Sequence, residues 1–152
     1  MKEKVYKELL LQLGGLIEGE TDAVAVLANT AALLHDMMGD RFFWTGFYIA
    51  RGDELVLGPF QGPIACYRIR CGRGVCGTAW ERDETIVVPD VEQFPGHIAC
   101  SSLSRSEIVV PVHDRTGRVA AVLDIDSRDL AAFDDTDAHY LNRVATLLSP
   151  VI

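Results

Sequence analysis

The sequence predicts an α+β fold in which helices from the two ends of the chain pack against a mostly antiparallel central sheet. Apolar residues recur at helical spacing near both termini, and the middle of the chain is rich in aromatic and β-branched residues separated by short turns. With 152 residues and no Pro- or Ser-rich linker, we expect one domain over 1–152.

Three longer helices are expected, two of them before the first strand. Residues 2–17 carry apolar side chains at helical spacing, which predicts the first helix. Thr21 is the expected N-cap of a second helix that runs to about Met38, where Gly39 would end it. The last helix should begin at 134–137, where aspartates lie at the positive end of the helix dipole.

The segments between these helices predict strands and one short helix. Strands are expected at 42–50, 55–57, 64–69, 85–88, 106–113 and 118–126, with the short helix at 74–81. Turns at 51–54 and 114–117 predict antiparallel connections. Helices at both ends of such a run of strands are typical of the α+β class.

The charge of the chain restricts its partners. Twenty-two acidic against fourteen basic residues leave a net charge of -8. Nucleic acids and anionic membranes attract clustered positive charge, so neither is expected as a partner. The apolar stretches are far shorter than the roughly 20 residues that span a bilayer, and the first residues mix both charge signs. We therefore expect a cytoplasmic protein, in which thiols are kept reduced.

Three acidic residues are predicted to share one face of the late hairpin. With residues 115–116 at its tip, Glu107 would lie directly opposite Asp124, and Asp126 would lie two residues further along the same face. Crowded carboxylates raise the pKa of at least one member, which could provide a general acid and a site for an ammonium group. An exposed acidic sheet face in an acidic protein is the alternative, and this pattern alone does not exclude it.

The cysteines allow three interpretations. They are Cys66, Cys71, Cys76 and Cys100. No Cys-x-x-Cys pair is present, so the spacing predicts no metal site. A buried, inert cysteine describes Cys71 best. It describes Cys100 least well, because this residue lies in a polar loop between His97 and Arg105, either of which could lower the pKa of a nearby thiol.

Several stretches of the sequence together resemble the free methionine-(R)-sulfoxide reductases, a family of single GAF domains. They are GPFQGPIAC (58–66), GVCG (74–77), FPGHIAC (94–100), SEIV (106–109) and LDIDS (123–127). The resemblance runs from about Trp44 to Asp137, and it implies a GAF-like fold.

The resemblance also implies an activity and a set of site residues. The chain is expected to reduce free L-methionine-(R)-S-oxide with thioredoxin as electron donor and without a cofactor. Cys100 matches the catalytic cysteine, Cys66 the partner that forms a disulfide with it, and Cys76 a third cysteine that can join the recycling. The substrate pocket is expected to be lined by Trp44, Tyr48, Glu107, Asp124 and Asp126.

Two other functions remain open at this stage. A GAF-like domain can serve as a small-molecule sensor, here for an amino acid or another cationic ligand, without catalysis. A thiol redox switch without a substrate would use the cysteines but leave the three acids and Trp44 unexplained. The terminal helices, with their apolar stripes, could also form a homodimer.

Overall fold

The computed structural model describes residues 1–98 and 100–152, and its elements follow the predicted order. The helices are α1 (Lys2–Ile17), α2 (Ala23–Met38), η1 (Gly39–Arg41), α3 (Gly74–Arg82), η2 (Val91–Gln93) and α4 (Asp135–Leu148). The strands are β1 (Trp44–Arg51), β2 (Glu54–Gln61), β3 (Arg68–Arg70), β4 (Ile86–Val88), β5 (Ser106–His113) and β6 (Val119–Ser127).

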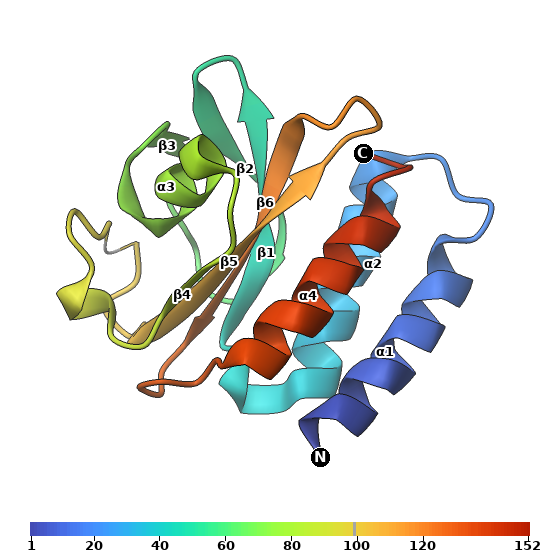
Figure 1. Cartoon of the computed structure of the whole chain (residues 1–152), viewed down its shortest axis with the longest axis horizontal. Helices are drawn as coiled ribbons and strands as arrows, with labels where there is room; N and C mark the ends of the chain where they lie inside the picture. Colours follow the sequence, from blue (N-terminus) through green and yellow to red (C-terminus); the bar gives the residue numbers. More distant parts are fainter. Residues whose placement is uncertain (99) are drawn as a thin grey trace.

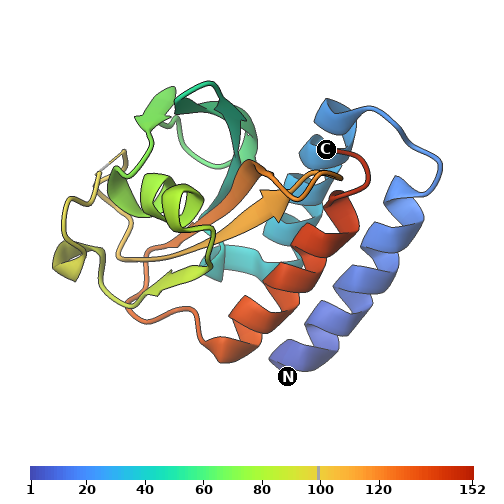
Figure 2. The same ribbon diagram turned by 45° about the horizontal axis from the view of Figure 1, so that its top comes forward.

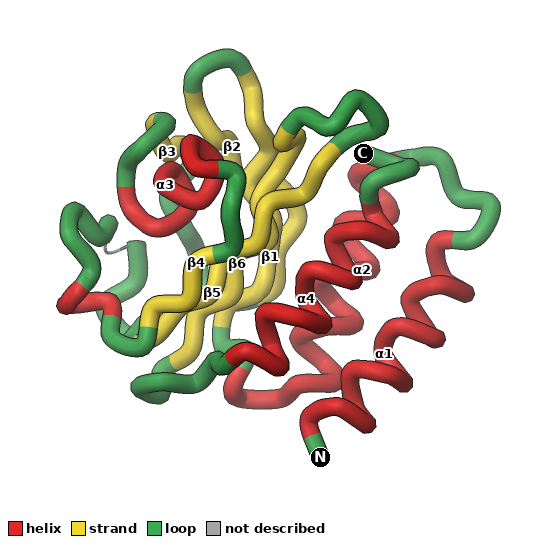
Figure 3. Tube along the Cα trace, viewed as in Figure 1, coloured by secondary structure: helices red, strands yellow, loops and turns green. Residues whose placement is uncertain are grey.

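The strands form a six-stranded sheet in the order β3-β2-β1-β6-β5-β4, and all neighbouring strands are antiparallel. Figures 1 and 2 show α1, α2 and α4 on one face of this sheet and α3 on the other. Figure 3 shows that long loops flank α3 on that second face. The predicted α+β class, with terminal helices against an antiparallel sheet, is confirmed.

Each face of the sheet has its own apolar core. The face toward α1, α2 and α4 buries aliphatic residues of β5 and β6 against those helices, among them Ile108, Val110, Leu123 and Ile125. The opposite face packs Val109 and Val122 against α3, together with aromatic residues of β1. Because side chains of a strand alternate between faces, one hairpin supplies both cores. Within the described part of the chain, no helix is long and apolar enough to span a bilayer.

The β5–β6 hairpin places the three acids on one face, as predicted, but in a different register. Glu107 lies opposite Asp126, and Asp124 lies opposite Val109. The predicted pairing of Glu107 with Asp124 was therefore wrong, and the register is shifted by two residues. Because side chains alternate with a period of two, this shift leaves all three acids on the same face.

Two one-residue irregularities cause the shift. Gly117 adopts a left-handed conformation (φ 87°), which lengthens the turn by one residue. A bulge between Val112 and His113 then leaves Ala120 as an extra residue on β6. Either irregularity alone would move the side chains of β6 to the opposite face of the sheet. The two together return them to the predicted face. Val119, which lies between the turn and the bulge, packs on the α3 face.

Several element ends also differ from the prediction: β1 begins two residues later than expected, and β2 runs on to Gln61 instead of ending at 57. The N-cap of α2 is Asp22 rather than Thr21, because the Asp22 carboxylate accepts the backbone N–H of Ala25. Of the strand expected at 64–69, only β3 at its far end pairs with the sheet. The rest of that segment is loop, and it carries Cys66.

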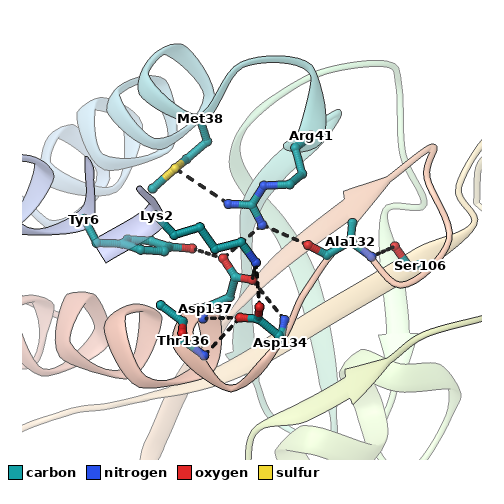
Figure 4. Close-up of polar contacts among 9 residues, drawn as sticks. All are labelled: Lys2, Tyr6, Met38, Arg41, Ser106, Ala132, Asp134, Thr136 and Asp137. Carbon is teal, nitrogen blue, oxygen red and sulfur yellow. Dashed lines mark hydrogen bonds and ion pairs between the residues drawn. The ribbon is translucent and has the colours of Figure 1, made fainter. Parts of the chain in front are cut away.

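A buried aspartate connects the N-terminal helix to the rest of the molecule (Figure 4). The fully buried carboxylate of Asp137 accepts hydrogen bonds from the Tyr6 hydroxyl at 2.6 Å, Lys2 Nζ at 2.8 Å and Arg41 at 2.9 Å. It also completes a capping box with Asp134 at the start of α4. This one side chain therefore joins α1, η1 and α4.

We expect Asp137→Ala to destabilise the fold by about 3–5 kcal/mol, because it leaves the cations Lys2 and Arg41 beside an empty buried site. Urea unfolding measures the loss. Asp135→Ala is the matched control, since Asp135 is exposed in the same helical turn and its removal should cost only a few tenths of a kcal/mol. Equal losses for the two variants would contradict the structural role of Asp137.

Candidate active site

A cavity lies on the α3 face of the sheet, between α3, the start of β1 and the acidic ends of β5 and β6. Its volume is about 40 Å³, room for a few water molecules, and its mouth is partly open to solvent. All eight site residues predicted from the sequence line it or flank its mouth. Those in its wall are Trp44, Tyr48, Cys76, Cys100, Glu107, Asp124 and Asp126.

One wall of the cavity is aromatic. Trp44 and Tyr48 lie on the same face of β1, four residues apart, and their rings stack with centroids 5.9 Å apart. The Trp44 indole donates a hydrogen bond to the carbonyl of Pro63 at 2.9 Å, and its other ring neighbour is Phe60 at 5.2 Å. Gly62 makes room for the indole, because a Cβ there would lie 2.8 Å from Trp44 Cδ1.

Tyr48 also fixes the loop that carries one of the predicted redox cysteines. Its hydroxyl donates a hydrogen bond to the backbone carbonyl of Cys66 at 3.0 Å. The Trp44 and Tyr48 side chains therefore hold the loop between β2 and β3 at two points, Pro63 and Cys66. Both rings are buried, so this contact is rigid.

The opposite part of the cavity is acidic and buried. Glu107 and Asp124 are each only 5% exposed, and Asp126 is partly buried beside them. The interpretation of these acids as an exposed sheet face is therefore wrong. Asp124 Oδ1 has no hydrogen-bond donor among the described residues unless a neighbouring acid or thiol is protonated. A buried carboxylate in this position requires a proton or a cation.

Burial is the main cause of the titration behaviour of this group. It raises the pKa of Glu107 and Asp126 well above the ordinary range, and the charge of Asp124 raises both further. Burial also raises the pKa of Asp124, while hydrogen bonds from Glu107 and Cys76 partly oppose this. Burial thus favours the protonated forms of these carboxyl groups, and a protonated member can donate a proton or, on binding a cation, release one.

A disulfide bond between Cys66 and Cys100 closes the mouth of the cavity, with their Cα atoms 5.5 Å apart. Both cysteines are partly exposed. Cys100 lies on a loop whose ends are held together by a hydrogen bond from the Val91 N–H to the Arg105 carbonyl at 2.9 Å. The bond thus joins two loops that are 34 residues apart in the sequence.

The two remaining cysteines differ in environment. Cys76 lies in the first turn of α3, buried beside Asp124, and burial raises the pKa of its thiol well above the usual value. Cys71 is exposed outside the cavity, so its interpretation as a buried residue was wrong. His97 lies with Nε2 3.8 Å from Glu107 Oε1, and burial lowers the pKa of its imidazole.

The sequence analysis missed the N-terminal end of α3 as a part of the cavity wall. Arg73, Gly74 and Val75 line the cavity, and the helix begins there without a side-chain cap. Free backbone N–H groups and a guanidinium favour an anion at such a position. Gly74 has φ 61°, and a Cβ on it would lie 3.1 Å from Ile98, so glycine lets the Cys100 loop pack on α3. In the sequence, the only signal for this position was Arg73 followed by Gly74 at the start of the expected short helix.

The cavity therefore combines groups that suit one kind of small ligand. Buried acids suit an ammonium group, an aromatic wall suits an apolar group, and the start of α3 suits a carboxylate. A free amino acid has these three features together. The disulfide at the mouth is a group that can exchange two electrons with thiols.

Comparisons with known proteins agree with this geometry. Residues 20–152 match the family model described as GAF domain. The chain is 55% identical over 148 residues to GAF domain-containing protein A of Dictyostelium discoideum, covering 97% of this chain and 92% of that protein. It is 46% identical over 151 residues to the free methionine-R-sulfoxide reductase of Escherichia coli, covering 99% of this chain and 90% of the relative.

A solved structure is also similar over nearly the whole chain. It is the X-ray structure of the free methionine-R-sulfoxide reductase from Neisseria meningitidis in complex with its substrate. The TM-score is 0.94 at 56% sequence identity, with 98% of this chain and 89% of that chain covered. The GAF-like fold that the sequence resemblance implies is thereby confirmed.

Proposed function

Because this chain belongs to the GAF domain family and has relatives named free methionine-R-sulfoxide reductase, we propose that it reduces free methionine-(R)-sulfoxide to methionine. The observation that carries the proposal is the Cys66–Cys100 disulfide at the mouth of a cavity with three buried acids. A sensor needs the cavity but not the disulfide, and a redox switch needs the disulfide but not the acids. A thiol-dependent reductase needs both.

In the first step, the thiolate of Cys100 attacks the sulfur of the bound sulfoxide. A carboxyl group of the acidic cluster donates a proton to the sulfoxide oxygen, which makes that oxygen able to leave the substrate sulfur. Methionine departs with its sulfur reduced by two electrons, and Cys100 retains the oxygen as a sulfenic acid. The raised pKa of Glu107 and Asp126 supports this role, because burial favours the protonated form that a general acid needs.

In the second step, the Cys66 thiol condenses with the Cys100 sulfenic acid, releasing water and forming the disulfide. Thioredoxin then reduces this disulfide by exchange and becomes oxidised itself. Cys76 is the third cysteine that could join the recycling, and it lines the same cavity. Since recycling needs a reducing compartment, a cytoplasmic location is part of the proposal.

Three parts of the cavity would bind the substrate: the buried acids, the aromatic wall and the N-terminal end of α3. The ammonium group would lie at the acids and supply the missing partner of Asp124 Oδ1. The S-methyl group would lie against Trp44, whose flat apolar ring would favour one sulfoxide epimer. The carboxylate would lie at the α3 terminus near Arg73. A cavity that holds both ends of a free amino acid leaves no room for a peptide chain.

The proposal is tested by assaying the two epimers of free methionine sulfoxide separately with thioredoxin, thioredoxin reductase and NADPH. We expect NADPH oxidation with the R epimer and none above background with the S epimer or with peptide-bound methionine sulfoxide. No turnover of either epimer by folded protein with reduced thiols would contradict the reductase function. Such a result would favour the amino-acid sensor, and a thermal-shift screen of amino acids would then identify its ligand.

A further inference from the structure

The fold brings together three potential metal ligands that no short motif connects. Cys76 comes from α3, Glu107 from β5 and Asp124 from β6. The Cys76 sulfur and one carboxylate oxygen each of Glu107 and Asp124 all lie within 4.8 Å of one another. All three side chains are buried. Tetrahedral zinc separates its ligand atoms by roughly 3.3–3.7 Å, so small side-chain rotations would bring these atoms into coordination.

Two further features of the cluster point to a cation. Asp124 Oδ1 is buried and has no donor among the described residues while its neighbours are ionised. His97 Nε2 lies 3.8 Å from Glu107 Oε1, just outside this group, so a shift of the His97 side chain would bring it into the ligand set.

We propose that Cys76 Sγ and one carboxylate oxygen each of Glu107 and Asp124 bind a divalent transition-metal ion of the zinc class, with His97 Nε2 as the fourth ligand. The thiolate and imidazole select this class, because Mg²⁺ and Ca²⁺ require shells of oxygen ligands. The ligands bind as thiolate and carboxylates, so binding releases to solvent whatever protons these three groups hold. The ion replaces these protons as the positive charge that the buried acids require.

The consequence for activity rests on the proposed function. The ion would occupy the position of the substrate ammonium group, so zinc and methionine sulfoxide would exclude each other. Cys76 is free when Cys66 and Cys100 are bonded, so the oxidised protein binds the ion as well. Zinc would thus act as a reversible inhibitor through the acids and Cys76, without reaction at Cys100.

The test is a titration of metal-free, oxidised protein with Co²⁺, which replaces zinc and is visible in absorption spectra. We expect one Co²⁺ per chain, with the intense visible bands of a tetrahedral site and a thiolate-to-cobalt charge-transfer band. The charge-transfer band should disappear in Cys76→Ser and persist in Cys71→Ser, the matched control for the other free thiol. No charge-transfer band in the wild type, or its loss in Cys71→Ser alone, would overturn the proposal.

A second variant keeps the test decisive if Cys76→Ser does not fold, as judged by circular dichroism. His97→Gln should retain the charge-transfer band but weaken Co²⁺ binding at least tenfold, since loss of even a second-shell partner costs about 10–100-fold in affinity. Unchanged affinity would remove His97 from the site. These readouts do not depend on turnover, so a failed epimer assay leaves them intact. Failure of methionine sulfoxide to displace Co²⁺ would overturn only the inhibitory role.

Discussion

Cys100→Ser is expected to lower turnover of free methionine-(R)-sulfoxide by roughly 10⁴-fold or more, as removal of a nucleophile does in other enzymes. A serine hydroxyl ionises too weakly and attacks sulfur too slowly to replace the thiolate. Substrate binding should persist, because the acids, Trp44 and the α3 terminus are unchanged. Steady-state kinetics measures the first effect and isothermal titration calorimetry the second.

Cys71→Ser is the matched control for this experiment. Cys71 is exposed and lies outside the cavity, so its replacement should leave kcat and KM within experimental error of the wild type. Turnover by Cys100→Ser similar to that of the wild type would contradict the mechanism. Loss of binding together with turnover would instead show that Cys100 holds the cavity in shape.

Glu107→Gln is expected to lower kcat by about 10²–10⁴-fold, the usual contribution of a general acid. The amide has the shape of the carboxyl group and can still donate hydrogen bonds to Asp124 and Asp126, but it cannot supply a proton to the sulfoxide oxygen. KM should change less than kcat, because the two aspartates remain to bind the ammonium group. The measurement is the pH dependence of kcat for both proteins.

The same variant should be more stable than the wild type at pH 7–8 in the absence of substrate. The pKa of Glu107 is raised in the folded state by burial, so above the unfolded value of about 4.3 the unfolded chain binds fewer protons than the folded one. Stability of the wild type therefore falls as pH rises, by at most about 1.4 kcal/mol per pH unit for one group. Glutamine does not ionise, so its contribution does not change with pH.

Urea unfolding at pH values from 4 to 8 checks this effect, with Glu92→Gln as control because Glu92 is exposed on η2. The advantage of Glu107→Gln should be largest at high pH and vanish near pH 4. A variant that is less stable than the wild type at pH 8 would mean that the carboxyl group is needed for the fold rather than for the reaction.

Much of the secondary structure could be predicted because local pattern decides it. α1 and β5 begin and end where the sequence places them, since the periodicity of their apolar residues is unbroken. The hairpin register could not be predicted, because the left-handed Gly117 and the bulge at Ala120 depend on packing at the end of the sheet. The shared face of the acids survived only because the two irregularities cancel.

The site shows the same division. The family resemblance identified the cysteines, the acids and the aromatic residues, and the cavity brings them together. The N-terminal end of α3 was not identified as part of the site, because its free backbone N–H groups are exposed only by the fold and Arg73-Gly74 is a weak signal by itself. The exposure of Cys71 and the burial of Cys76 were equally invisible, since the two lie in one short segment and differ only in their position relative to α3.

The sequence by itself determined the fold class, the order of the elements and the residue types available for chemistry, because short-range periodicity and side-chain identity are local properties. Only the tertiary structure decided which of these residues meet. Glu107, Asp124 and Cys76 come from three separate elements, and the packed fold both places their ligand atoms together and, through burial, raises the pKa on which the proposed proton transfer depends. Burial is a property of the packed molecule, so no segment of the chain encodes it alone.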